Sequence, residues 1–221
     1  MAEPLPPLVT TDMTRIRREA HRASDDRALA YAILDEAKIA HVGLVQDGQA
    51  LVIPMAFARD GDRLLLHAAK ASRIARTLAA GEPICVTVTH LDGMVLARSA
   101  FNHSMNYRSV MVVGSATPIT DEAELVTALD ALVDQLVPGR SAEARPGNRV
   151  ELRQTAVLAL PIHEASVKVR TGGPQDDDDD LGLPIWAGVV PMTMTWGAPE
   201  SDPAVDPALP LPSAVSLWTS R

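Results

Sequence analysis

Cationic and hydroxyl side chains gather at the start of a helix predicted over residues 72–80. Lys70 precedes this helix, Ser72 can cap its first turn and Arg73 lies on that turn. The free N–H groups and the dipole at a helix N-terminus favour an anion, and an arginine fork matches two oxygens of a phosphate. We therefore expect these three side chains to bind a phosphate group. The alternative is an ordinary helix cap beside a surface arginine.

A second polar pair, Arg108 and Ser109, begins an apolar strand predicted over residues 107–119. A guanidinium and a hydroxyl are both groups that bind phosphate oxygens. Two such groups, each at the end of an apolar strand, favour an anion site more than either does alone. We expect Arg108 and Ser109 to contact the same ligand as Arg73.

His67 closes a strand predicted over residues 63–67, directly before the phosphate turn. The reference pKa of an imidazole is close to neutral, so this side chain could donate a proton to a bound substrate. The alternative is a strand-end histidine whose hydrogen bonds are satisfied within the fold. His67, His90 and His103 match no metal-ligand spacing and no cysteine motif supports them, so we predict no metal site.

The charge and cysteine content exclude several classes of partner and location. The chain has 221 residues and a net charge of −8, which argues against nucleic acid or an anionic membrane as the main partner. Cys85 is the only cysteine, and no apolar run is long enough to span a bilayer. Prolines interrupt the first residues, where a signal peptide needs an apolar core. We therefore expect a cytoplasmic protein.

Strand and turn signals predict a mainly β fold with flanking helices. The expected elements are a helix over 25–37, strands over 38–45, 49–58 and 63–67, a helix over 72–80, strands over 84–90 and 107–119, a helix over 120–137, and strands over 155–162 and 165–170. Successive antiparallel strands with tight turns indicate a barrel or a sandwich. We expect one domain over residues 24–196, an N-terminal arm over 1–23 and a Pro-rich tail over 197–221.

Three local signals refine this reading. Asp47-Gly48 and Asp92-Gly93 each have the composition of a β-hairpin turn. Pro54 lies inside a predicted strand and has no N–H to donate, so that strand should be at an edge or bulged there.

Four short segments occur in an order that resembles a known family. They are Leu66-His67, Ser72-Arg73, the stretch over residues 107–114 and the stretch over residues 186–191. The chain resembles the pyridoxamine 5′-phosphate oxidase-like FMN-binding split β-barrel proteins, and within them the nitroimidazole-resistance (nitroimidazole reductase-like) branch. This resemblance covers residues 25–195. It implies a six-stranded antiparallel split β-barrel that forms a homodimer, with two FMN sites at the subunit interface.

The resemblance also implies roles for particular residues. The backbone of the second strand would line the flavin ring, through Val52, Ile53, Pro54, Met55 and Ala56. His67 and Ala68 would stand beside the ring and its phosphate arm, and Ser72 and Arg73 would hold the phosphate, with Lys70 near them. Ser109, with Arg108 beside it, would contact the cofactor, and Trp186 would approach the ring from the partner subunit. Branches that act on nitroimidazoles carry a histidine at the position that His67 matches.

The chain departs from true pyridoxamine phosphate oxidases in two places. It lacks their Arg-x-His segment near the C-terminus, so vitamin B6 oxidation is not expected. It also has Ile74 where those enzymes have a second phosphate-binding lysine, which leaves Arg76 or Lys70 for that contact.

The leading hypothesis is an FMN-dependent oxidoreductase that reduces a nitroaromatic or quinone-like small molecule with electrons from NAD(P)H. In such a protein the flavin supplies the hydride chemistry, and the chain binds and orients it. The alternatives are a flavin- or haem-binding split-barrel protein without turnover, and a reductase that uses a deazaflavin.

Overall fold

The computed structural model describes residues 5–219. Residues 1–4 of the predicted arm and residues 220–221 of the predicted tail lie outside the described residues. The strands are β1 (Ala23–Ser24), β2 (Ile39–Gln46), β3 (Gln49–Asp60), β4 (Arg63–Ala69), β5 (Pro83–Leu96), β6 (Ser104–Ser115), β7 (Thr117–Pro118), β8 (Thr155–Pro161), β9 (Glu164–Arg170) and β10 (Gly188–Pro191). The α-helices are α1 (Arg27–Glu36), α2 (Arg73–Ala79), α3 (Glu122–Leu136), α4 (Arg149–Gln154) and α5 (Ser213–Thr219).

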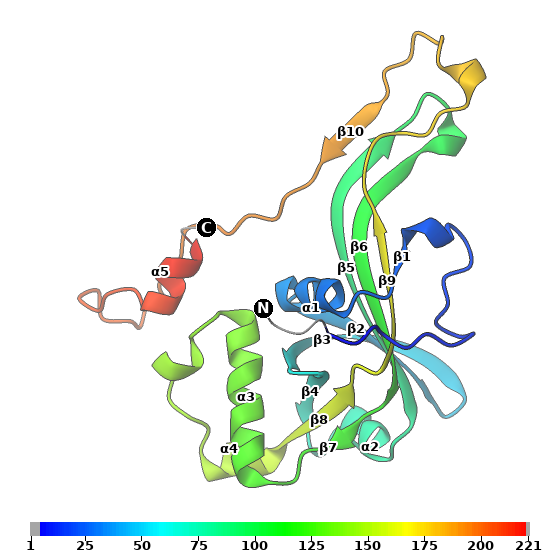
Figure 1. Ribbon diagram of the computed structural model, residues 1–221. Coiled ribbons are helices and arrows are strands. Elements are labelled where there is room, and N and C mark those ends of the chain that lie inside the picture. Colours follow the sequence, from blue (N-terminus) through cyan, green and yellow to red (C-terminus); the bar gives the residue numbers. More distant parts are fainter. Residues whose placement is uncertain (1–4, 220–221) are drawn as a thin grey trace.

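The strands form one antiparallel sheet in the order β1-β9-β6-β5-β2-β3-β4-β8-β7, with β10 added to β5 (Figure 1). The prediction of a mainly β fold with flanking helices, of the split-barrel type, is confirmed. The sheet has ten strands rather than six, and it is not closed. Part of the difference is three short edge strands, β1, β7 and β10, which have two, two and four residues.

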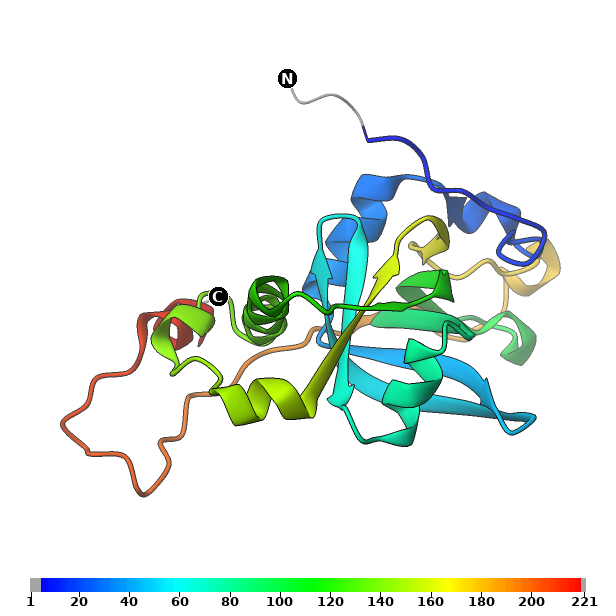
Figure 2. The same ribbon diagram turned by 90° about the horizontal axis from the view of Figure 1, so that it is seen from below.

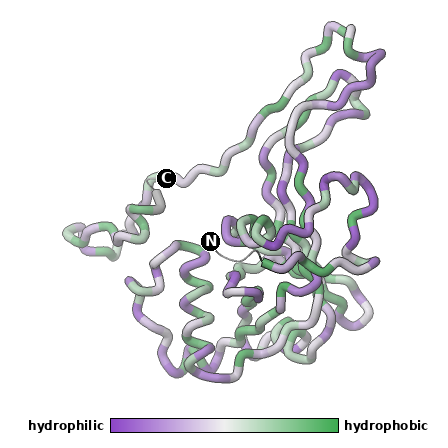
Figure 3. The backbone as a smooth tube through the Cα atoms, viewed as in Figure 1, coloured by the Kyte–Doolittle hydropathy of each residue, from purple (hydrophilic) through white to green (hydrophobic). Residues whose placement is uncertain are grey.

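Alternating burial along the strands builds the main core on one side of the curved sheet. Ile33 and Leu34 of α1 pack there against strand residues such as Phe57, Leu66 and Val86. A smaller core lies on the outside of the sheet, where α3 covers β3, β4 and β8. The tube of α3 interleaves hydrophobic and hydrophilic colours, as expected for a helix with one buried stripe (Figure 3).

The hairpin predicted at Asp47-Gly48 is confirmed. Both residues have positive φ angles, 50° and 75°, as a two-residue hairpin turn of this composition requires. The ladder between β2 and β3 runs without a break and pairs Pro54 with His41, so there is no bulge at the proline. However, β4 pairs with β3 only from Phe57 onward. Pro54 therefore lies in the part of β3 whose other edge is free of β4, which explains how its missing N–H is tolerated.

The hairpin predicted at Asp92-Gly93 is wrong. β5 continues through this dipeptide as one strand, with Leu91 opposite Tyr107 and Gly93 opposite Asn106. Asp92 is thus the extra residue of a bulge, which bends the strand without turning it. Beyond the bulge β5 and β6 extend as a projecting arm, which carries β10 along its edge (Figure 1).

The C-terminal part contains structure that the sequence signals missed. After β10, residues 192–212 run as an extended strap away from the body, and α5 then returns beside α3 (Figure 2). Ala214 of α5 lies against Gly139, and its N–H donates to Oε1 of Glu143 over 3.2 Å. No helix of the described part of the chain is both long and apolar enough to cross a membrane.

Candidate functional site

One face of the sheet, opposite the main core, is left largely open by the helices. Directly paired residues of antiparallel strands share a face, so the register places Pro54, His41, Thr87 and Met111 in one row across β3, β2, β5 and β6. Ile39, Val45 and Val52 of the same face are 58%, 61% and 66% exposed. We call this surface the open face. A surface on which several large apolar side chains are exposed is typical of a ligand or partner site.

The residues predicted to line a flavin ring divide between the two faces of β3. Val52, Pro54 and Ala56 point to the open face, and Val52 and Pro54 are exposed. Ile53 and Met55 point the other way and pack against the main core. A flat ring on this face would therefore meet the first three side chains and the free edge of the strand.

His67 reaches the margin of the open face at the end of β4. It follows Leu66, whose partner is Phe57, so the same register brings His67 beside Ala56. The imidazole is exposed, and among the described residues nothing hydrogen-bonds to it. Ala68 comes next and pairs with Ala156 of β8. His67 is thus free to meet a ligand, as a proton donor or as a metal ligand needs to be.

The predicted phosphate turn lies next to this histidine. The hydroxyl of Ser72 accepts a 3.2 Å hydrogen bond from the N–H of Ala75 and so caps α2. Arg73 and Lys70 are exposed, and no ion pair within the described chain engages either of them. The structure therefore brings His67, Lys70, Ser72 and Arg73 to one end of the open face.

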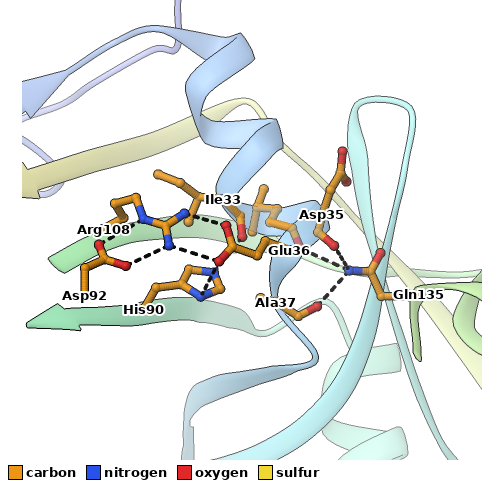
Figure 4. Close-up of polar contacts among 9 residues, drawn as sticks. Ile33, Asp35, Glu36, Ala37, His90, Asp92, Arg108 and Gln135 are labelled. Atoms are coloured by element: carbon orange, nitrogen blue, oxygen red, sulfur yellow. Dashed lines mark hydrogen bonds and ion pairs between the residues drawn. The ribbon is translucent and has the colours of Figure 1, made fainter. Parts of the chain in front are cut away.

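Arg108 points away from this group, toward the C-terminal end of α1. Its guanidinium donates to both carboxylate oxygens of Glu36, over 2.5 and 3.0 Å, and to both of Asp92, over 3.0 and 2.8 Å (Figure 4). These hydrogen bonds lower the pKa of Glu36 and of Asp92, and they raise the pKa of Arg108. Arg108 thus makes four charge-assisted hydrogen bonds within the fold, and the structure does not place it with Arg73.

The contacts around Arg108 continue into a network that joins two helices, α1 and α3, and two strands, β5 and β6. His90 of β5 approaches the carbonyl of Ile33 with Nε2 at 3.0 Å and lies 3.6 Å from Glu36 with Nδ1. Gln135 of α3 donates to the carbonyls of Leu34, Asp35 and Ala37, which closes the end of α1 (Figure 4). Sequence reasoning missed this network because its partners lie far apart in the chain and no local pattern links them.

The two remaining predicted residues lie on other parts of the molecule. Ser109 points to the open face, where its hydroxyl donates to the carbonyl of Lys168 over 3.3 Å. Trp186 precedes β10 on the projecting arm, is 66% exposed and stacks close to the backbone of Gly188. It is not near the phosphate turn of its own chain, which agrees with its expected role toward a partner subunit but does not test it.

A family model described as pyridoxamine 5′-phosphate oxidase matches residues 26–169. The chain belongs to this family. The match covers the sheet from α1 to β9 and therefore includes the open face and the phosphate turn. No curated protein matches the chain.

Solved structures of this family extend the likeness to the whole chain. The flavocytochrome Anf3 from Azotobacter vinelandii is 42% identical, with a TM-score of 0.90 over 96% of this chain and 99% of Anf3. An FAD- and haem-binding protein from Mycobacterium smegmatis is also 42% identical, with a TM-score of 0.86 over 90% and 97% of the two chains. A protein proposed to confer 5-nitroimidazole antibiotic resistance, from Bacteroides thetaiotaomicron, is 24% identical and shares the fold, with a TM-score of 0.57 over 66% and 86%.

Proposed function

We propose that this family member binds both a flavin and a haem, with FAD as its flavin. One observation carries the proposal: the 42% identity to the flavocytochrome Anf3 spans nearly the full length of both chains, and the FAD- and haem-binding protein from Mycobacterium smegmatis is equally similar. Both cofactors, rather than FMN alone, are therefore the best-supported expectation. FMN and a deazaflavin become the alternatives.

The open face suits a flavin on chemical grounds. Val52, Pro54 and Ala56 offer a flat apolar surface, and the free edge of β3 offers backbone groups to the polar atoms of the ring. Arg73 and Ser72 would bind a phosphate at the end of the same face, where Ser72 caps α2 and Arg73 is exposed. A bound flavin would supply hydride chemistry there, while these residues would bind and orient it.

A histidine whose ring has no hydrogen-bond partner within the fold would be available to hold a haem. His90 bonds to a backbone carbonyl, His103 bonds to the carbonyl of Ser99, and His21 lies 3.7 Å from Glu19. His41 and His67 are both on the open face and, within the described chain, neither ring has a partner. His41 pairs with Pro54 and so lies where the flavin ring is expected. We assign the axial contact to His67, at the margin of the face, since a neutral imidazole is a common haem ligand.

An oxidoreductase activity belongs to the same proposal. NAD(P)H would reduce the flavin, and a nitroaromatic or quinone-like molecule would be the acceptor. A cytoplasmic location is part of the proposal as well, since Cys85 is the only cysteine and no intrachain disulfide can form.

We further propose that two copies form a homodimer across the open face. The projecting arm and the strap carry large apolar side chains that the chain itself leaves exposed, including Phe101 at 91%, Trp186 at 66% and Met194 at 80%. In a twofold arrangement the arm and strap of each copy can cover the open face of the other. The exposed apolar side chains of one copy are then buried against those of its partner. A second copy is therefore the occupant that accounts for both patches together.

The absorption spectrum of the freshly purified full chain tests the cofactor proposal. Flavin bands together with a Soret band are the expected result, and chromatography of the flavin released by heat should show FAD rather than FMN. Flavin bands without a Soret band, even after haemin is added, would return the protein to the flavin-only class. A protein that takes up neither flavin nor haem would contradict the proposal.

A further inference from the structure

Positive charge gathers at the edge of the open face that is farthest from the phosphate turn. The N-terminal segment before β1 supplies Arg18 and Arg22, and β9 supplies Lys168 and Arg170. We call these four residues the basic corner. The protein as a whole has a net charge of −8, so an uncompensated cluster of cations is unusual in it.

Arg170 is the centre of the basic corner. It is only 6% exposed, yet all its hydrogen bonds go to neutral oxygens: the side-chain oxygen of Asn106 at 2.5 Å and the carbonyls of Gly172 and Gly173 at 3.4 and 3.0 Å. Burial and the nearby positive charge of Arg22 lower the pKa of Arg170. A buried guanidinium normally has a carboxylate partner, and within the described chain Arg170 has none.

Lys168 extends this charge onto the open face. The register pairs Lys168 with Ser109 and Arg170 with Tyr107, so both cations share the face of those two residues. The ammonium group of Lys168 donates to the backbone carbonyl of Arg18 over 3.3 Å, which again is a neutral partner. β1 lies on the other side, where Ala23 pairs with Lys168. The corner therefore has a fixed position between the N-terminal segment and the sheet.

Among the described residues, Glu19 supplies the ion pair that the basic corner makes. Glu19 lies 2.9 Å from the guanidinium of Arg22 and 3.7 Å from His21. Its backbone has φ 56° and ψ 48°, a left-handed conformation that is strained for a residue with a side chain. This unusual backbone turns the chain at η1 (Ala20–Arg22), which packs beside β9. One negative charge among four positive ones leaves room for a further anion.

We propose that the basic corner binds an oxyanion, a phosphate or a carboxylate, of a ligand that lies on the open face. The proposal rests on the cofactors proposed above. Haem carries two propionates, and FAD carries two adjacent phosphates, which would bind at this corner in place of the phosphate turn. The site is separate from the phosphate turn. β9 and β4 are five positions apart in the sheet, which is about 24 Å along it at roughly 4.8 Å per strand.

Lys168→Gln is the primary variant, because its side chain is partly exposed and its loss should leave the fold intact. Lys168→Arg should restore the charge, and Arg149→Gln, an exposed cation on α4, is the matched control. Titrations of the cofactor-free full chain would use FAD, riboflavin, haemin and haemin dimethyl ester. We expect Lys168→Gln to lower the affinity for one charged ligand by on the order of tenfold or more, because a hydrogen bond between charged groups is lost.

The pattern of losses identifies the source of the oxyanion. If the variant binds FAD more weakly but riboflavin with unchanged affinity, the oxyanion is a phosphate. If it binds haemin more weakly but haemin dimethyl ester with unchanged affinity, the oxyanion is a propionate. Arg22→Gln should act in the same direction, and Arg170→Gln is a third variant if it folds. Unchanged affinity for FAD and haemin in both Lys168→Gln and Arg22→Gln would overturn the proposal.

A separate probe distinguishes failure of this site from failure of the cofactor proposal. If the wild type binds neither FAD nor haemin, inorganic pyrophosphate replaces them and the melting temperature is the readout. A stabilisation that is present in the wild type and in Arg149→Gln but lost in Lys168→Gln supports the basic corner. Equal stabilisation of all three, or none, would overturn it.

Discussion

At the scale of single residues, Arg108 shows how a plausible ligand contact becomes part of the scaffold. A cation at a strand end has the chemistry of a phosphate site, but Glu36 and Asp92 accept four hydrogen bonds from its guanidinium. The sequence could not reveal this, because Glu36 lies 72 positions away along the chain. Arg73 has the same chemistry and no such partner within the described residues, which is why the structure leaves it available.

The Arg108 cluster should make stability depend on pH. The pKa values of Glu36 and Asp92 are lowered in the folded protein, so their contribution is complete above the ordinary carboxyl pKa and is lost as the pH falls through the lowered values. Arg108→Gln should cost about 1 kcal/mol at neutral pH, because the pairs are partly exposed. Urea unfolding between neutral and acidic pH should show a smaller loss of stability in the variant. An identical pH dependence would contradict the account.

His67 gives a second prediction at this scale. His67→Ala should lose the Soret band or shift it strongly while the flavin bands persist, since the imidazole is the proposed axial ligand and not part of the phosphate turn. His163→Ala is the control, because His163 is exposed and lies in the turn between β8 and β9. A normal Soret band in His67→Ala, with loss of the band in His41→Ala, would transfer the role to His41.

At the scale of elements, two Asp-Gly dipeptides with the same local signal have different structures. Asp47-Gly48 turns a hairpin, whereas Asp92-Gly93 forms a bulge inside one long strand. What separates them is not local: Asp92 pairs with Arg108, and β10 lies against Gly93. Regular elements with strong periodicity, such as the helix α3 and the strands of the core, were predictable for the opposite reason, because their signals lie within the segment itself.

Gly93 is predicted to be required for the attachment of β10. A Cβ atom there would lie 2.9 Å from the carbonyl oxygen of Val190 and 3.3 Å from Cα of Pro191, both of which are backbone atoms. Gly93→Ala should therefore displace β10 and cost about 1–3 kcal/mol, as overpacking does. Thermal unfolding would measure the loss, and faster amide exchange in β10 would locate it. Gly182→Ala is the control, since nothing lies within 4 Å of its added Cβ. A melting temperature equal to that of the control would contradict this role.

At the scale of the whole molecule, family and fold were predictable from the sequence, but the proposed pairing of FAD with a haem was not. Ordered motifs from Leu66-His67 to the stretch over 186–191 indicated the split barrel. Nothing local distinguishes FMN from FAD, because the parts of a flavin that differ would lie beyond the phosphate turn. The open face is likewise a property of the assembled sheet: it becomes visible only when His41, Pro54 and Thr87 come into one row.

The arm and strap lead to a prediction about assembly. Ending the chain after Pro191 removes the strap and α5, whose described residues belong to neither core cluster, so the body should keep nearly its full melting temperature. The dimer should dissociate at concentrations at which the full chain stays paired, because apolar area at the interface is lost. Thermal unfolding would measure the melting temperature. Light scattering during size-exclusion chromatography would measure the molar mass of the full chain and of the shortened chain. Phe101→Asp on the arm should act in the same direction, and Val150→Asp on α4, also an exposed apolar residue, is the control. A full chain that is monomeric at micromolar concentration would contradict the proposed homodimer, and the exposed arm would then need a different partner.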